Sequence, residues 1–185
     1  MACARLAVLL TAAVALGGCG TLSSINPFSS GSSAVAASCP TAAVLRPLSQ
    51  TAVFRPGAAA QPTNVAFYGI LSDVEAKCDR TGGAVRASLD VVVIGERGPA
   101  AAAMGGNSVD LQYFVAVTGP DQTVISKRTL PVHIDIPADA RRAGITDHIE
   151  EMIPVGAVPG NQLNIMLGFQ QGPEVVDFYR HFRGR

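Results

Sequence analysis

Residues 84–93, AVRASLDVVV, decide the fold of this chain. Polar side chains at Arg86, Ser88 and Asp90 alternate with apolar ones. Because successive side chains of a β-strand point to opposite faces, this pattern predicts a strand with one buried face. The residues expected on that face are Val85, Ala87, Leu89, Val91 and Val93. Gly98-Pro99 ends the pattern.

The same alternation recurs towards the C-terminus. Gly119-Pro120-Asp121 predicts a turn, because proline presets φ and aspartate caps turns, so residues 109–117 and 123–127 form an expected hairpin. Pro131 cannot donate a ladder hydrogen bond, which predicts a sheet edge or a strand start. The expected buried positions are Val109, Leu111, Tyr113, Val115 and Val117, then Leu130, Val132, Ile134 and Ile136, and finally Leu163, Ile165, Leu167 and Phe169.

Further strands are expected before this region. Residues 65–78 form a long apolar-rich run, and residues 42–45 with 51–54 supply a first strand broken at Pro47. Helical spacing of apolar residues predicts a short helix within 138–153 and a second one within 174–182. The total is about seven strands, which predicts an all-β fold, a single antiparallel β-sandwich.

The N-terminus has the pattern of an export signal. Arg5 is followed by the apolar run Leu6 to Leu16, which is too short to span a bilayer. Leu16-Gly17-Gly18-Cys19 then resembles the lipobox of bacterial lipoproteins. That resemblance implies thioether diacylation of Cys19, cleavage before it and acylation of the new amino terminus, with palmitate as the expected chain. The other interpretation is an ordinary signal peptide followed by a chance cysteine.

The signal and the tether divide the chain into three parts. Residues 1–18 are the expected signal peptide, and residues 19–38 are a lipidated tether rich in Ser, Gly and Ala. Residues 39–185 are the expected sandwich domain. In lipoproteins of this type an aspartate after the lipidated cysteine favours the inner membrane, so Gly20 favours the outer membrane, with the domain in the periplasm.

The cysteines sort by location. Cys3 leaves with the signal and Cys19 carries the lipid, so Cys39 and Cys78 remain as an even pair in an oxidising compartment. We predict a disulfide between them. Two buried free thiols, or a metal pair, are the other interpretation, although two cysteines without a nearby histidine make a poor zinc site.

The mature chain resembles small proteobacterial lipoproteins with an immunoglobulin-like or fibronectin-III-like domain. The residues that carry the resemblance are Cys39-Pro40, Cys78 and Gly168-Phe169-Gln170. The chain departs from antibody-type domains because it has no Trp and because Cys39 precedes the first strand.

The sequence shows no assembled catalytic site. There is no G-x-S-x-G elbow and no phosphate-binding glycine motif. His133 and Asp135 share a strand face, as a general-base pair or an ordinary polar edge would. Asp147, His148 and Glu151 form an ionisable cluster for which a metal or a solvated face is an equal explanation. We therefore predict no catalytic residue, no metal and no cofactor.

Composition and surface residues point to an interaction protein. With 14 Lys+Arg against 14 Asp+Glu and no Trp, neither a phosphate-binding groove nor a base-stacking platform is expected, which argues against nucleic acid. Phe114 lies on the polar face of its strand, either as a partner contact or packed under a loop. The loop 99–108 is a second place for contacts. The expected function is a membrane-anchored, non-enzymatic structural or protein-interaction module of the cell envelope, with an unknown envelope protein as its partner. The alternative is an envelope carrier for a small apolar ligand.

Overall fold

We describe the chain from a computed structural model that covers residues 39–154 and 158–182. The expected signal peptide, Cys19 and the tether of residues 19–38 lie outside the described residues.

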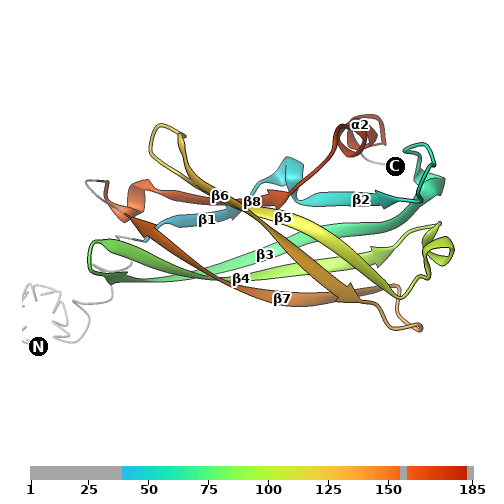
Figure 1. Cartoon of the computed structure of the whole chain (residues 1–185), viewed down its shortest axis with the longest axis horizontal. Coiled ribbons are helices and arrows are strands. Elements are labelled where there is room, and N and C mark those ends of the chain that lie inside the picture. Colours follow the sequence, from blue (N-terminus) through green and yellow to red (C-terminus); the bar gives the residue numbers. More distant parts are fainter. Residues whose placement is uncertain (1–38, 155–157, 183–185) are drawn as a thin grey trace, which may run out of the picture.

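Two four-stranded sheets pack face to face in the described part of the chain (Figure 1). One sheet has the order β1 (Thr41–Val44), β8 (Asn164–Phe169), β5 (Ser108–Thr118), β6 (Val124–Asp135). The other has the order β2 (Gln50–Phe54), β3 (Val65–Thr81), β4 (Ala84–Arg97), β7 (Arg142–Pro154). Of the pairings, β1 with β8 is parallel and the others are antiparallel. The predicted all-β sandwich is therefore confirmed, with eight described strands instead of about seven.

The core lies between the sheets and follows the predicted alternation. The inward faces of β4 and β5 are almost completely inaccessible to solvent, and Tyr113, at 0% exposure, is the largest of these side chains. Pro131 lies in β6, which is an edge strand as predicted. The confirmed inward positions are Val85, Ala87, Leu89, Val91, Val93, Val109, Leu111, Tyr113, Val115, Val117, Val132, Ile134, Ile136, Leu163, Ile165, Leu167 and Phe169.

The first predicted strand is split between the two sheets. β1 pairs with β8, and β2 pairs with β3 in the opposite sheet. The 3₁₀ turn Arg46–Leu48 joins them with Pro47 near its start. Because proline lacks an amide proton and fixes φ, the strand ends there and the chain changes sheets.

The helix expected within residues 138–153 is wrong, because β7 (Arg142–Pro154) occupies most of that range. Ile145, Ile149 and Ile153 are four residues apart, a spacing that suits one face of a helix and equally one face of a strand. Pairing with β4 selects the strand, in which Ile149 and Ile153 are buried. The second expected helix is confirmed as α2 (Pro173–Phe182).

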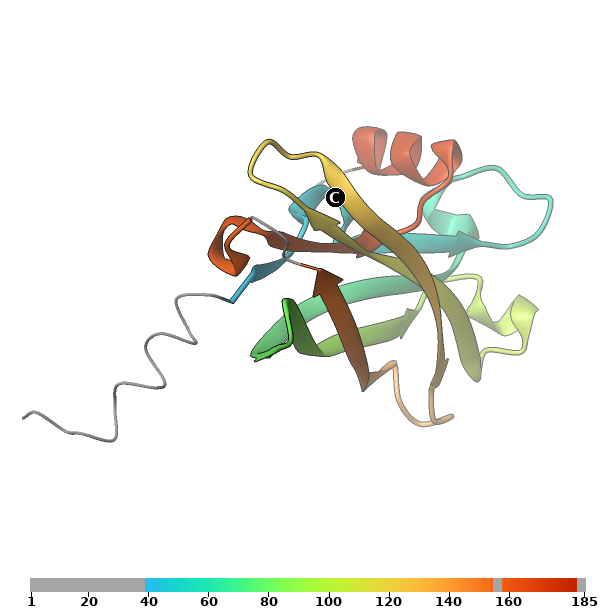
Figure 2. The ribbon, with the colours of Figure 1, turned by 60° about the vertical axis from the view of Figure 1, so that its left-hand side comes forward.

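Helix α2 covers the outer face of the sheet at β2 and β3 (Figure 2). Phe178 packs edge-on against Phe54 with ring centroids 5.2 Å apart, and Tyr68 of β3 joins the same cluster. Helix α2 thus builds a small second apolar cluster outside the main core.

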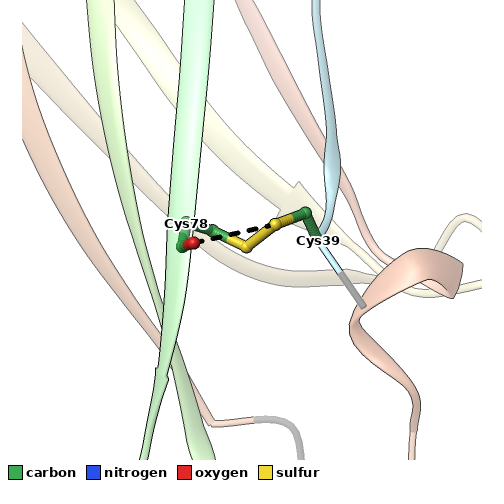
Figure 3. Close-up of a disulfide and its surroundings, with 2 residues drawn as sticks. All are labelled: Cys39 and Cys78. Carbon is green, nitrogen blue, oxygen red and sulfur yellow. Dashed lines mark hydrogen bonds between the residues drawn. A yellow bond between two sulfur atoms is a disulfide. The ribbon is translucent and has the colours of Figure 1, made fainter. Parts of the chain in front are cut away.

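The predicted disulfide between Cys39 and Cys78 is present, with a Cα–Cα distance of 5.9 Å (Figure 3). It joins the residues just before β1 to the second half of β3. In that half β3 has no β2 partner, because the β2 register ends at the pair Gln50 and Ile70. The disulfide therefore links the sheets where strand pairing on that side of β3 has stopped.

The two ends of the sandwich carry different segments (Figure 1). The start of β1, just after Cys39, lies at one end with the β3–β4 hairpin and the β5–β6 hairpin. The β2–β3 loop, the 3₁₀ turn Ala101–Met104 and the β6–β7 connection lie at the other end. The described chain thus begins at the end opposite these three connections.

Candidate functional site

The candidate site arises because β8 is shorter than its neighbour β5. β8 pairs with residues 113–118 of β5 and ends at Phe169, opposite Tyr113. The chain then turns away into α2, while β5 extends towards the far end of the molecule (Figure 1). Residues 108–112 of β5 therefore lack a β8 strand beside them, apart from one hydrogen bond from the Gln170 amide to the Gln112 carbonyl at 3.0 Å.

A cavity of about 490 Å³ occupies this place. We call it the edge groove. It is lined by residues 51–58 and 60 of β2 and its following loop, residues 110–112 of β5, and Gln170, Gly172, Glu174 and Val175. Its lining includes residues 55–58 and 60 of the β2–β3 loop, which lies at the end of the sandwich opposite the start of β1 (Figure 1).

Backbone groups of β5 point into the edge groove. The Ile136 amide donates to Asn107 O (2.7 Å), and the Gln170 amide donates to Gln112 O (3.0 Å). These two bonds set the alternation: odd-numbered residues of β5 pair with β6, and even-numbered ones face β8. The amide and carbonyl of Asp110 therefore face the edge groove. Backbone groups on an unpaired strand edge are ready hydrogen-bonding partners for another strand.

The walls of the edge groove differ by depth. Inward-facing Leu111 and Thr51 are buried, and Val53 is half-buried against the main core. At the rim Arg55, Asp110 and Glu174 are exposed. The floor of the groove therefore combines the apolar Leu111 and Val53 with Thr51, and its rim carries two carboxylates and one guanidinium.

Asp110 also belongs to a polar cluster on the outer face of β5 and β6. His133 Nδ1 lies 2.7 Å from Asp110 Oδ1, and His133 Nε2 lies 3.2 Å from Asp135 Oδ1. The hydrogen bond with Asp110, and then that with Asp135, raises the pKa of His133 above its ordinary value. The predicted His133–Asp135 pair therefore exists on an exposed face, and the sequence pattern did not show that Asp110 completes it.

Arg97 braces the loops at the groove end. Its guanidinium donates to the carbonyls of Ile136 (2.8 Å), Pro137 (2.9 Å), Ala140 and Gly106. These bonds tie the predicted 99–108 loop to the β6–β7 connection. Within that loop, residues 101–104 form a 3₁₀ turn, so part of it is ordered secondary structure.

The ionisable cluster of β7 does not converge on one point. In a strand, Asp147 and Glu151 face one side and His148 faces the other. His148 Nδ1 lies 2.6 Å from Asp90 Oδ1, whereas the Tyr113 hydroxyl donates to Asp147 Oδ2 at 2.6 Å. The shared metal face drawn from helical spacing is therefore wrong. In the described ranges no group of three His, Cys, Asp or Glu side chains is placed to hold a metal ion.

A polar seam of side-chain bonds links the two sheets along β6 and β7. Besides the bond between Tyr113 and Asp147, the Arg128 guanidinium donates to Glu151 Oε1 and to the Glu150 carbonyl. The sequence pattern does not reveal this seam, because its members are far apart in the chain. Inward-facing charges at Asp147 and Glu151, in the strand pattern of β7, were the signal that could have found it.

Phe114 is 8% exposed on the outer face of β5. The Lys127 ammonium lies 4.4 Å from its ring centroid, and the ring sits over Gly168 of β8, whose missing side chain leaves room for it. This position matches packing beneath neighbouring residues, and the role of Phe114 as a partner contact stays a prediction.

Comparison of the chain with protein-family models, curated proteins and solved structures gives no match. Among the residues that the structure describes, no helix has the length and apolarity needed to cross a membrane.

Proposed function

We propose that this chain is a cell-envelope lipoprotein, anchored by lipid at Cys19, whose β-sandwich is a non-enzymatic module that binds another envelope protein. One observation carries the proposal: the β2–β3 loop, which lines the edge groove, lies at the end of the sandwich opposite the start of β1, just after Cys39 (Figure 1). A domain tethered through Cys39 presents the groove away from the membrane, where a partner reaches it. The lipobox Leu16-Gly17-Gly18-Cys19 supports the anchor, and Gly20 supports the outer membrane with the domain in the periplasm.

The immunoglobulin-like or fibronectin-III-like relationship is part of the proposal. Two packed four-stranded sheets support it. The relationship we propose is one of two-sheet architecture and not of strand order. In this chain β2, β3 and β4 follow each other within one sheet, whereas in immunoglobulin domains the chain crosses to the other sheet after two consecutive strands.

The alternative function, a carrier for a small apolar ligand, has one observation in its favour. A volume of about 490 Å³ is typical of ligand pockets. Two features favour a protein partner instead. The rim of the edge groove is charged, and the space between the sheets, where a carrier would hold its ligand, is occupied by the buried Tyr113, Phe67 and Phe169.

The test is cross-linking in intact cells followed by purification of the anchored protein. Metabolic labelling with an alkyne fatty acid should mark the wild-type chain and leave Cys19→Ala unlabelled and released from membranes. One envelope protein should be enriched with the wild-type chain. Unlabelled wild-type protein would remove the anchor from the proposal, and reproducible absence of any enriched protein would remove the interaction function.

A further inference from the structure

We propose that the edge groove binds an extended segment of the partner protein, which adds to β5 as a strand in the place that β8 leaves vacant. This inference rests on the proposed function and names the chemistry of the partner.

The first step is the unpaired strand edge. Beyond the bond between Gln170 and Gln112, the next groove-facing residue of β5 is Asp110. An added strand that continues the β8 ladder places one residue directly opposite Asp110, with its amide and carbonyl paired to those of Asp110. Main-chain hydrogen bonds of this kind give affinity without requiring a particular sequence.

The alternation of side chains decides which residues the added strand prefers. Residues on an added strand alternate in the same way as those of β5. A residue opposite Asp110 points outwards, between the carboxylates of Asp110 and Glu174. Its neighbours point inwards onto Leu111 and Val53. Since opposite charges directly across a strand pair stabilise each other, the preferred motif is apolar–basic–apolar.

The charge of the rim argues for the occupant. Asp110 and Glu174 outnumber Arg55 among the exposed charged residues that line the edge groove, so the rim carries a net negative charge. A basic, extended segment of the partner protein complements that charge.

The experiment uses the full lipidated chain in detergent and a synthetic probe, acetyl-Lys-Val-Lys-Val-Lys-amide, with binding followed by fluorescence anisotropy of a labelled copy. Hydrogen-exchange mass spectrometry of the same sample should show protection of residues 108–112. The free edges of β6 and β7 serve as internal controls. Protection at either of those edges in place of residues 108–112 overturns the proposal.

Backbone methylation of the probe separates strand addition from nonspecific attraction. In the expected register the amide of the central lysine bonds to β5 and the valine amides point away from it. Methylating the central lysine nitrogen removes its hydrogen bond to β5 and should weaken binding about tenfold or more. Methylating one valine nitrogen removes no hydrogen bond to β5 and should leave binding within about threefold. Equal effects of the two methyl groups overturn the proposal.

Variants of the protein test the same edge. Asp110→Asn removes the charge and should reduce affinity for the lysine probe while keeping the methylation effect. Asp110→Pro removes the groove-facing amide as well and should abolish binding. Thr129→Pro is the matched control, because the Thr129 amide faces the opposite, free edge of β6. Unchanged binding by Asp110→Pro overturns the proposal.

The outcome in cells distinguishes this inference from the proposed function. If Asp110→Pro loses the cross-linked partner and Thr129→Pro keeps it, both stand. If both variants keep the partner, the module binds through another surface and strand addition is wrong. If the wild-type chain has no cross-linked partner and does not bind the probe, the proposed function and strand addition are both contradicted.

Discussion

Removal of the Cys39–Cys78 disulfide should destabilise the domain by about 4 kcal/mol. The bond closes a loop with a sequence separation of 39 residues. In the chain-entropy model a loop of this length removes about 13 cal/mol/K from the unfolded chain, which is about 4 kcal/mol at 25 °C. The location strengthens the expectation, because the bond joins the residues just before β1 to β3, and these two strands belong to different sheets and do not pair.

Urea unfolding of the Cys39→Ser/Cys78→Ser variant, followed by circular dichroism, measures this loss. With a slope of about 2 kcal/mol/M, the midpoint should fall by about 2 M. Wild-type protein treated with dithiothreitol should show the same fall, and the double variant should not respond to dithiothreitol. A loss below about 1 kcal/mol would refute the reasoning, since the loop would then be constrained without the bond.

Three further predictions follow from individual contacts. Tyr113→Phe should cost about 1.5–3 kcal/mol in urea unfolding, because Asp147 loses the hydroxyl that binds it at 2.6 Å; no measurable loss would show that the seam between β6 and β7 does not stabilise the fold. Gly98→Ala should cost about 1–3 kcal/mol, because an added Cβ would lie 2.3 Å from the Val65 carbonyl oxygen; a neutral result would mean that the loop shifts freely. The pKa of His133, followed by NMR, should fall more in Asp110→Asn than in Asp135→Asn, since Asp110 is the stronger cause of its upward shift. A larger fall of the pKa in Asp135→Asn than in Asp110→Asn would contradict the geometry. The stabilisation that comes from the raised pKa of His133 is complete below the unfolded value near 6.5 and is lost as pH rises through the folded value.

The inward faces of the strands could be predicted because alternation is a local property. Each of β4, β5 and β8 buries one face completely, so every second residue is apolar and the pattern is continuous. β7 lacks that continuity. Its inward face includes Asp147 and Glu151, which bind Tyr113 and Arg128 from the other sheet. The spacing of its isoleucines therefore suited a helix equally well, and only the pairing with β4 decided between the two.

The candidate site could not be predicted for a different reason. The edge groove depends on where β8 ends relative to β5, and strand ends are set by register between segments far apart in the sequence. The exposure of Asp110, opposite the core face of β5, follows from the alternation within that strand, which is a local property. That its backbone lacks a β8 neighbour follows from the turn of the chain at Gln170 to Gly172, which no periodicity records.

The sandwich has one gap closed by a disulfide and one open gap. Because the first strand is split between the sheets, β2 leaves the second half of β3 without a neighbour on one side, and the Cys39–Cys78 disulfide crosses that gap. At the other end β8 leaves residues 108–112 of β5 without a neighbour, and the chain places a cavity of about 490 Å³ there. The disulfide thus closes the gap at the end where Cys39 lies. At the opposite end the β2–β3 loop and the first turn of α2 border the edge groove without filling it. An unpaired edge is a liability unless it is covered or used, which is the strongest reason to expect a strand from another protein at Asp110.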